Sequence, residues 1–227
     1  MRETFEKEMR LLQDELVGLG SMVEDALASS IQALQSRDLP TAQRIIAEDC
    51  YINERRFAIE SEALVLIATQ QPIAGDLRII AAVLELCTEL ERIGDYAKGI
   101  ARICLTMGDS PPIKPLIDIP KMAAKVQEML RQSLSAFVRR DLDLARSIPP
   151  QDDEVDALYN AVYHELLEII ITDSSNIDRA TFLLWVAHNL ERAADRVTNI
   201  CERTVFMVTG QMSEMDTREE GVCGIVG

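Results

Sequence analysis

The chain has 227 residues, with 38 acidic and 23 basic side chains and a formal net charge of −15. This excess of negative charge argues against a nucleic-acid binder, which needs a basic face to neutralise phosphates, and it fits a protein that holds cations or meets basic partners. Hydrophobic residues make up 48% of the chain but aromatic residues only 4%, which favours packed helices over a β-sandwich.

Prolines and periodic apolar residues divide the chain into six expected helices. A proline inside a helix costs about 3 kcal/mol, so the eight prolines mark joints between helices. Apolar residues recur at steps of three or four, as in the series Ile80, Val83, Cys87 and Leu90, which is the pattern of an amphipathic helix. The predicted helices cover roughly residues 3–36, 40–70, 73–107, 119–141, 151–172 and 177–210.

The sequence contains an internal repeat. Residues 23–39 match residues 126–142, which lie 103 positions later, and residues 89–95 match residues 189–195. Each copy therefore contains three of the predicted helices. Long helices with short connections form antiparallel bundles, so the fold class predicted is all-α, with two tandem pseudo-symmetric three-helix bundles.

The same pattern gives the domain organisation. We predict a first three-helix repeat over residues 1–110, a proline-rich linker over 111–120 and a second three-helix repeat over 121–210. The polar and then glycine-rich tail, residues 211–227, is expected to be disordered.

One acidic motif, Glu-x-x-x-Asp, occurs in both copies as Glu91/Asp95 and Glu191/Asp195. Residues four apart share a helix face, so each motif brings two like charges together. Carboxylate oxygens suit hard cations, and a bound cation would reverse the repulsion. The alternative is a solvated acidic face with arginine and lysine neighbours.

A second acidic signal lies in the second helix of each copy. Asp49 and Asp152 each occupy a position in the apolar stripe where an apolar residue is expected, and a buried carboxylate is costly unless it is paired or bound to metal. Pairing of Asp49 with Arg56 is the metal-free alternative. Antiparallel packing would bring these residues towards the Glu-x-x-x-Asp motifs. The predicted metal ligands are Asp49, Asn53, Glu91 and Asp95 in the first copy and Asp152, Asp156, Glu191 and Asp195 in the second.

Other chemistry is poorly supported by the sequence. His164 and His188 lack the Glu-x-x-His spacing of di-iron proteins, and no nucleophile and base are suitably spaced, so no catalytic residue and no enzyme activity are predicted. Trp185 is expected in the core. The five cysteines form no CxxC pair, and the first residues lack an apolar signal region. We therefore expect a cytoplasmic protein without membrane insertion.

Two segments of the first copy resemble the PhoU family of phosphate-signalling regulators: residues 71–78, Gln-Pro-Ile-Ala-Gly-Asp-Leu-Arg, and residues 90–98, Leu-Glu-Arg-Ile-Gly-Asp-Tyr-Ala-Lys. Residues 190–200 and 208–210 resemble the second copy of the same family. The resemblance implies a six-helix architecture with metal ions held by the two Glu-x-x-x-Asp motifs. The metal stays open among iron, zinc, manganese and magnesium.

The resemblance also implies a function without catalysis. PhoU-like proteins restrain phosphate uptake and keep the phosphate-starvation (Pho regulon) response off, as adaptors between the phosphate ABC transporter ATPase and its sensor histidine kinase. A homodimer is expected, because long bundles often dimerise. Asn53 and Gly99 stand where the second copy has Asp156 and Asn199, so the first site is expected to bind metal more weakly or to bind fewer ions. The alternatives are a carboxylate-ligated metalloenzyme and a metal-free helical scaffold.

Overall fold

Long helices account for most of the chain. The computed structural model describes residues 2–215, apart from the side chain of Arg2, and within that range it contains no strand. The first repeat contains α1 (Arg2–Ser36), α2 (Leu39–Gln70) and α3 (Ala74–Met107). The second contains α4 (Asp118–Arg139), α5 (Leu142–Ser147), α6 (Asp152–Thr172) and α7 (Ile177–Thr209), with short 3-10 helices η1 (Pro149–Gln151) and η2 (Ser174–Asn176). The all-α prediction is confirmed, and the six long helices begin and end within two residues of their predicted limits. The tail predicted to be disordered lies, from residue 216, outside the described residues.

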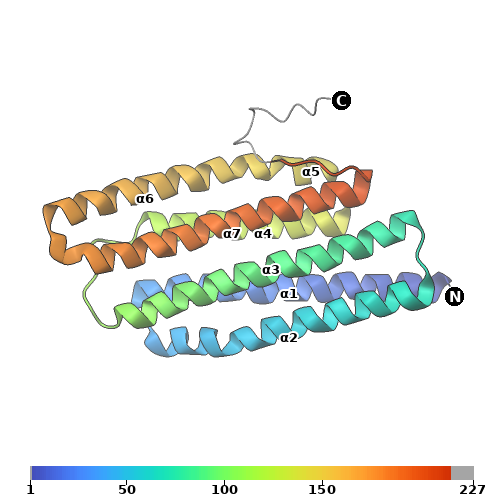
Figure 1. Ribbon diagram of the computed structural model, residues 1–227, viewed down its shortest axis with the longest axis horizontal. Coiled ribbons are helices and arrows are strands. Elements are labelled where there is room, and N and C mark those ends of the chain that lie inside the picture. Colours follow the sequence, from blue (N-terminus) through green and yellow to red (C-terminus); the bar gives the residue numbers. More distant parts are fainter. Residues whose placement is uncertain (1, 216–227) are drawn as a thin grey trace, which may run out of the picture.

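The two repeats lie against each other along their length (Figure 1). α3 packs on α7 and α1 packs on α4, so these four helices form the interior of the molecule. α2 and α6 lie on opposite outer sides, each packed against the last helix of its own repeat.

A turn repeated in both copies explains one of the sequence matches. Arg37 and Arg140 adopt left-handed backbone conformations, with φ of 58° and 52°, and each is followed by an aspartate that caps the next helix. Asp38 accepts a hydrogen bond from the Thr41 backbone N–H, and Asp141 accepts one from that of Leu144. The Arg-Asp-Leu sequence is thus a helix stop followed directly by a helix start.

The structure differs from the prediction over residues 142–150, where no helix was expected. α5 begins at Leu142, the position equivalent to Leu39 at the start of α2. Pro149 and Pro150 then form η1 before the chain enters α6. The second copy of α2 is therefore broken in two, because the paired prolines cannot continue an α-helix.

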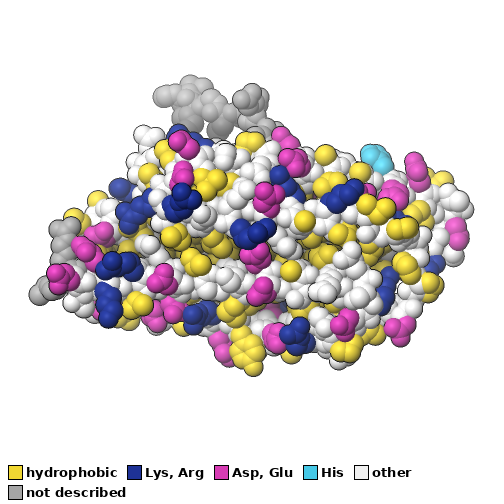
Figure 2. Space-filling model, turned by 180° about the vertical axis from the view of Figure 1, so that it is seen from behind, with side chains coloured by type: hydrophobic (Ala, Val, Ile, Leu, Met, Phe, Trp, Pro, Cys, Tyr) yellow, Lys and Arg dark blue, Asp and Glu magenta, His cyan; other side chains and the backbone are white. Residues whose placement is uncertain are grey.

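Hydrophobic side chains also lie on the surface, where Figure 2 shows them among acidic and basic side chains over one face. The expectation that Trp185 lies in the core is wrong: the residue is 57% exposed. Its neighbours Leu183, Val186 and Ala187 fill the buried face of α7, so Trp185 falls on the opposite side of the helix. It packs edge-on against the ring of Phe182, with 6.5 Å between ring centroids.

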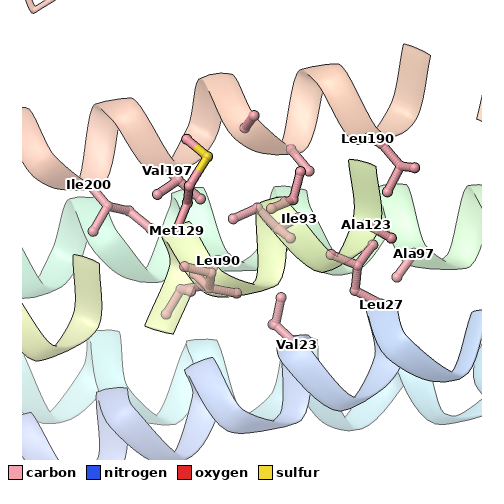
Figure 3. Packing of buried hydrophobic residues seen from close by; sticks show 14 of the residues in the cluster. Val23, Leu27, Leu90, Ile93, Ala97, Ala123, Met129, Leu190, Val197 and Ile200 are labelled. Carbon is pink, nitrogen blue, oxygen red and sulfur yellow. The ribbon is translucent and has the colours of Figure 1, made fainter. Parts of the chain in front are cut away.

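One hydrophobic core runs through both repeats. Figure 3 shows side chains from four helices pointing toward one another, and every residue that it labels is buried. The labelled residues are Val23 and Leu27 of α1, Leu90, Ile93 and Ala97 of α3, Ala123 and Met129 of α4, and Leu190, Val197 and Ile200 of α7. Each repeat therefore buries its inner face against the other.

Candidate acidic sites of the two repeats

The first acidic site is organised around Asp49, which is 6% exposed on the face of α2 that packs on α3. The Lys98 Nζ atom of α3 lies 2.5 Å from Asp49 Oδ2 and 3.7 Å from Asp95 Oδ1. The Asn53 side-chain amide donates to Asp49 Oδ2 at 3.2 Å. Antiparallel packing thus brings Asp49, Asn53 and Asp95 together as expected, but around an ammonium group.

Arg56, seven residues after Asp49 on α2, supplies a second positive charge between α2 and α3. Its Nη1 atom lies 3.3 Å from Glu91 Oε2, and its Nε–H donates to Glu60 Oε1 at 2.8 Å. The metal-free alternative had paired Arg56 with Asp49. The structure instead pairs across the helices, Asp49 with Lys98 and Arg56 with Glu91, as the antiparallel register dictates.

The surroundings of Glu91 disfavour its ionised form. Burial raises its pKa above the ordinary value, and the nearby Asp95 carboxylate raises it further, while Arg56 opposes both effects. A carboxyl whose folded pKa is raised contributes stability below its unfolded pKa, and this contribution is lost as the pH rises through the folded pKa. At neutral pH the ionised Glu91 is therefore a cost to the fold.

We expect Glu91→Gln to raise the free energy of unfolding of the metal-free protein at pH 7. The advantage should vanish as the pH falls well below the ordinary glutamate pKa of about 4.3, where Glu91 is protonated in both states. Urea unfolding followed by circular dichroism at both pH values measures this. The control is Glu48→Gln, on the exposed side of α2, where no such pH-dependent gain is expected. An equal response of both variants would contradict the interpretation.

In the second repeat the predicted residues come from α6 and α7, which pack together. The Glu191 Oε2 atom lies 3.4 Å from His188 Nδ1, and Asp195 Oδ2 lies 3.4 Å from Arg192 Nη1. Tyr159 of α6 is close enough to Glu191 for that carboxylate, together with burial as the larger cause, to raise the pKa of its hydroxyl. Asp152 and Asp156 precede Tyr159 on the same helix.

The two sites differ in their built-in charges. The repeat places Tyr159 at the position of Arg56 and Thr198 at the position of Lys98. If the second repeat keeps the register that pairs Asp49 with Lys98 and Arg56 with Glu91, Thr198 is expected opposite Asp152 and Tyr159 opposite Glu191, and the effect of Glu191 on the pKa of Tyr159 agrees with the second pairing. The two basic residues that lie between the helices of the first site are thus replaced by neutral residues with oxygen atoms in the second, where Arg192 remains beside Asp195.

This difference bears on the predicted metal ligands. In the first set, Lys98 and Arg56 already supply positive charge to the carboxylates, so a metal ion bound there would have to displace them. In the second set, Asp152, Asp156, Glu191 and Asp195 have the donor chemistry of a hard-cation site. Among residues 2–215, no three His, Cys, Asp or Glu side chains converge as a ready-made metal site. The ligand assignments of both repeats therefore stay predictions.

Sequence reasoning missed a polar connection between the repeats. Glu89 of α3 accepts a hydrogen bond from the Asn199 amide of α7 at 3.1 Å, and Arg196 Nη1 lies 3.4 Å from the same oxygen. At the pseudo-equivalent contact, a Cβ at Gly99 would lie 3.5 Å from the Asn189 amide. The Gly99/Asn199 difference, taken from the sequence as a weakness of the first metal site, thus belongs to the α3–α7 interface.

The buried cysteines Cys87 and Cys201 offer little scope for thiolate chemistry. Cys87, Cys104 and Cys201 are buried and free, and Cys50 is free on the surface of α2. Burial raises the pKa of both Cys87 and Cys201 to about 12, so these two thiols stay protonated at neutral pH. Across residues 2–215, no helix has the length and apolar character needed to cross a membrane.

These features define a class of protein: an all-α repeat protein whose two pseudo-equivalent helix pairs carry carboxylates on their packed faces. The family model for the PhoU domain matches residues 16–104 and 119–204, one match in each repeat, and the chain belongs to the PhoU family. The resemblance stated from the sequence is confirmed.

Relatives match over nearly their whole length. The chain is 38% identical to the phosphate-specific transport system accessory protein PhoU homolog of Clostridium acetobutylicum, covering 95% of this chain and 99% of the relative. It is also 38% identical to the protein of that description from Caulobacter vibrioides, covering 92% and 91%. The crystal structure of the phosphate transport system regulatory protein PhoU from Streptococcus pneumoniae superposes with a TM-score of 0.86 at 32% identity, covering 92% of this chain and 99% of the other.

Proposed function

We propose that this protein is a negative regulator of phosphate uptake and of the phosphate-starvation response, and that it acts by binding other proteins rather than by catalysis. The observation that carries the proposal is the near full-length match to relatives described as accessory proteins of the phosphate-specific transport system. The partners proposed are the ATPase of the phosphate ABC transporter and the phosphate-sensing histidine kinase. Both meet the protein in the cytoplasm.

The architecture suits an adaptor. The shared core holds α1, α3, α4 and α7 together, and leaves α2 and α6 as outer helices on opposite sides (Figure 1). α2 exposes several large apolar side chains, namely Tyr51, Phe57, Leu64 and Val65. Two separated outer surfaces allow two partners to be bound at once. A homodimer stays a prediction, which light scattering coupled to gel filtration checks.

Direct binding measurements test the regulatory proposal. The full chain should bind the purified transporter ATPase and the cytoplasmic part of the kinase in biolayer interferometry, and deleting its gene should switch on the phosphate-starvation response in high phosphate. No binding to either partner, together with normal repression in the deletion strain, would refute the proposal. Turnover of phosphoesters by the metal-loaded protein would favour the metalloenzyme alternative instead.

We further propose that a hard cation is held by the second repeat, through Asp152, Asp156, Glu191 and Asp195. Support comes from the all-oxygen donor set and from the neutral Tyr159 and Thr198 at the positions where the first repeat has Arg56 and Lys98. Such an ion would neutralise the carboxylates and fix the relative position of α6 and α7. Elemental analysis of protein purified without chelators tests this: a metal content of zero would support the metal-free scaffold.

A further inference from the structure

The Lys98 ammonium occupies the place that a metal ion would take in the first repeat. It lies within 4 Å of two carboxylates from different helices, Asp49 of α2 and Asp95 of α3. Its side chain is 20% exposed and that of Asp49 only 7%, so the pair is largely shielded from water.

The remaining carboxylate of this cluster is also engaged. Glu91 faces the Arg56 guanidinium, which is anchored in turn by Glu60. A divalent ion entering between α2 and α3 would meet two fixed positive charges and would have to displace at least one of them from its carboxylates. Each displaced cation would then need a new partner or water.

We propose that Lys98, assisted by Arg56, is the permanent counter-cation of the first repeat, so that metal binding in this protein is confined to the second repeat. Only the location of the bound metal, in this inference, rests on the metal site proposed for the second repeat. The role of Lys98 stands on its own contacts. In the first repeat, these ion pairs then hold α2 and α3 together whether or not metal is present.

Manganese binding to the full-length, chelator-treated protein tests the proposal. Free Mn²⁺ is measured by electron paramagnetic resonance during a titration, which gives the number of ions bound. Removing the first-site carboxylates in the variant Asp49→Asn/Glu91→Gln is expected to leave the number of bound ions unchanged. The matched second-site variant, Asp152→Asn/Glu191→Gln, is expected to lose the bound ion.

Converting the first site into the residues of the second is the complementary experiment. The variant Lys98→Thr/Arg56→Tyr is expected to bind one additional Mn²⁺, whereas the exposed control Lys121→Thr binds as the unaltered protein does. Circular dichroism verifies folding, and Lys98→Gln, which keeps a polar side chain, replaces the double variant if the latter does not fold.

The outcomes separate the two proposals. Loss of bound Mn²⁺ in Asp49→Asn/Glu91→Gln, or no additional ion in a folded variant lacking the Lys98 charge, would overturn the role of Lys98. If the unaltered protein binds no Mn²⁺, the proposed second-repeat site fails, while an ion gained on removal of Lys98 still supports the proposed role of that lysine.

Discussion

Replacing Lys98 by methionine is expected to lower the free energy of unfolding by about 3 kcal/mol, because it leaves the Asp49 carboxylate buried without its counter-charge. The ammonium lies 2.5 Å from Asp49 Oδ2 across the α2–α3 interface, and Asp49 is 6% exposed. The amide of Asn53 remains as a hydrogen-bond donor but carries no charge. Urea unfolding of the metal-free protein, followed by circular dichroism, measures the loss.

Two further variants separate the buried pair from a general effect of removing a lysine. Lys121, whose side chain is 60% exposed beside Asp118, is the control, and Lys121→Met should cost less than about 1 kcal/mol. The double variant Asp49→Leu/Lys98→Met should recover most of the stability, because an apolar pair can replace a buried ion pair at little cost. Equal losses in Lys98→Met and Lys121→Met would contradict the structural interpretation.

The case of Asp49 illustrates how far the sequence leads towards the site. A carboxylate in an apolar stripe predicts that a partner is present, and the structure places one there. The sequence does not select the partner, because a metal ion and a lysine on another helix satisfy the same carboxylate. Arg56, seven residues along α2 from Asp49, lies on the same helix face, but its long side chain reaches Glu91 of α3 instead. Choosing between these arrangements requires the register of two antiparallel helices.

The fold was more predictable than the site. Prolines and turn residues limit the six long helices, and those signals are local. The failures arose where a local signal had two interpretations. The apolar run around Trp185 covers more than one face of α7, so part of it must face water. The paired prolines Pro149 and Pro150 predict a joint, but the stretch before them is long enough to form α5 before the prolines break the helix.

The shared core leads to an expected result that distinguishes one cooperative unit from two independent bundles. Leu90 of α3 and Leu190 of α7 are pseudo-equivalent, fully buried and part of the same cluster (Figure 3). Truncating a buried leucine to alanine removes apolar contacts and leaves a cavity, at a cost of about 3 to 5 kcal/mol. We therefore expect Leu90→Ala and Leu190→Ala to destabilise the protein by similar amounts.

The only tryptophan of the chain, Trp185, lies in the second repeat and reports on that repeat by fluorescence. If the core is shared, Leu90→Ala in the first repeat shifts the urea midpoint seen by Trp185 fluorescence as much as the midpoint seen by circular dichroism, since α3 cannot unfold without exposing the inner face of α7. Ile171→Ala, at a position 83% exposed on α6, is the control and should change the free energy of unfolding by less than about 0.5 kcal/mol. If Leu90→Ala leaves the urea midpoint of Trp185 fluorescence unchanged, the repeats unfold independently. In that case a structural change at one acidic site would not be transmitted through the core to the other.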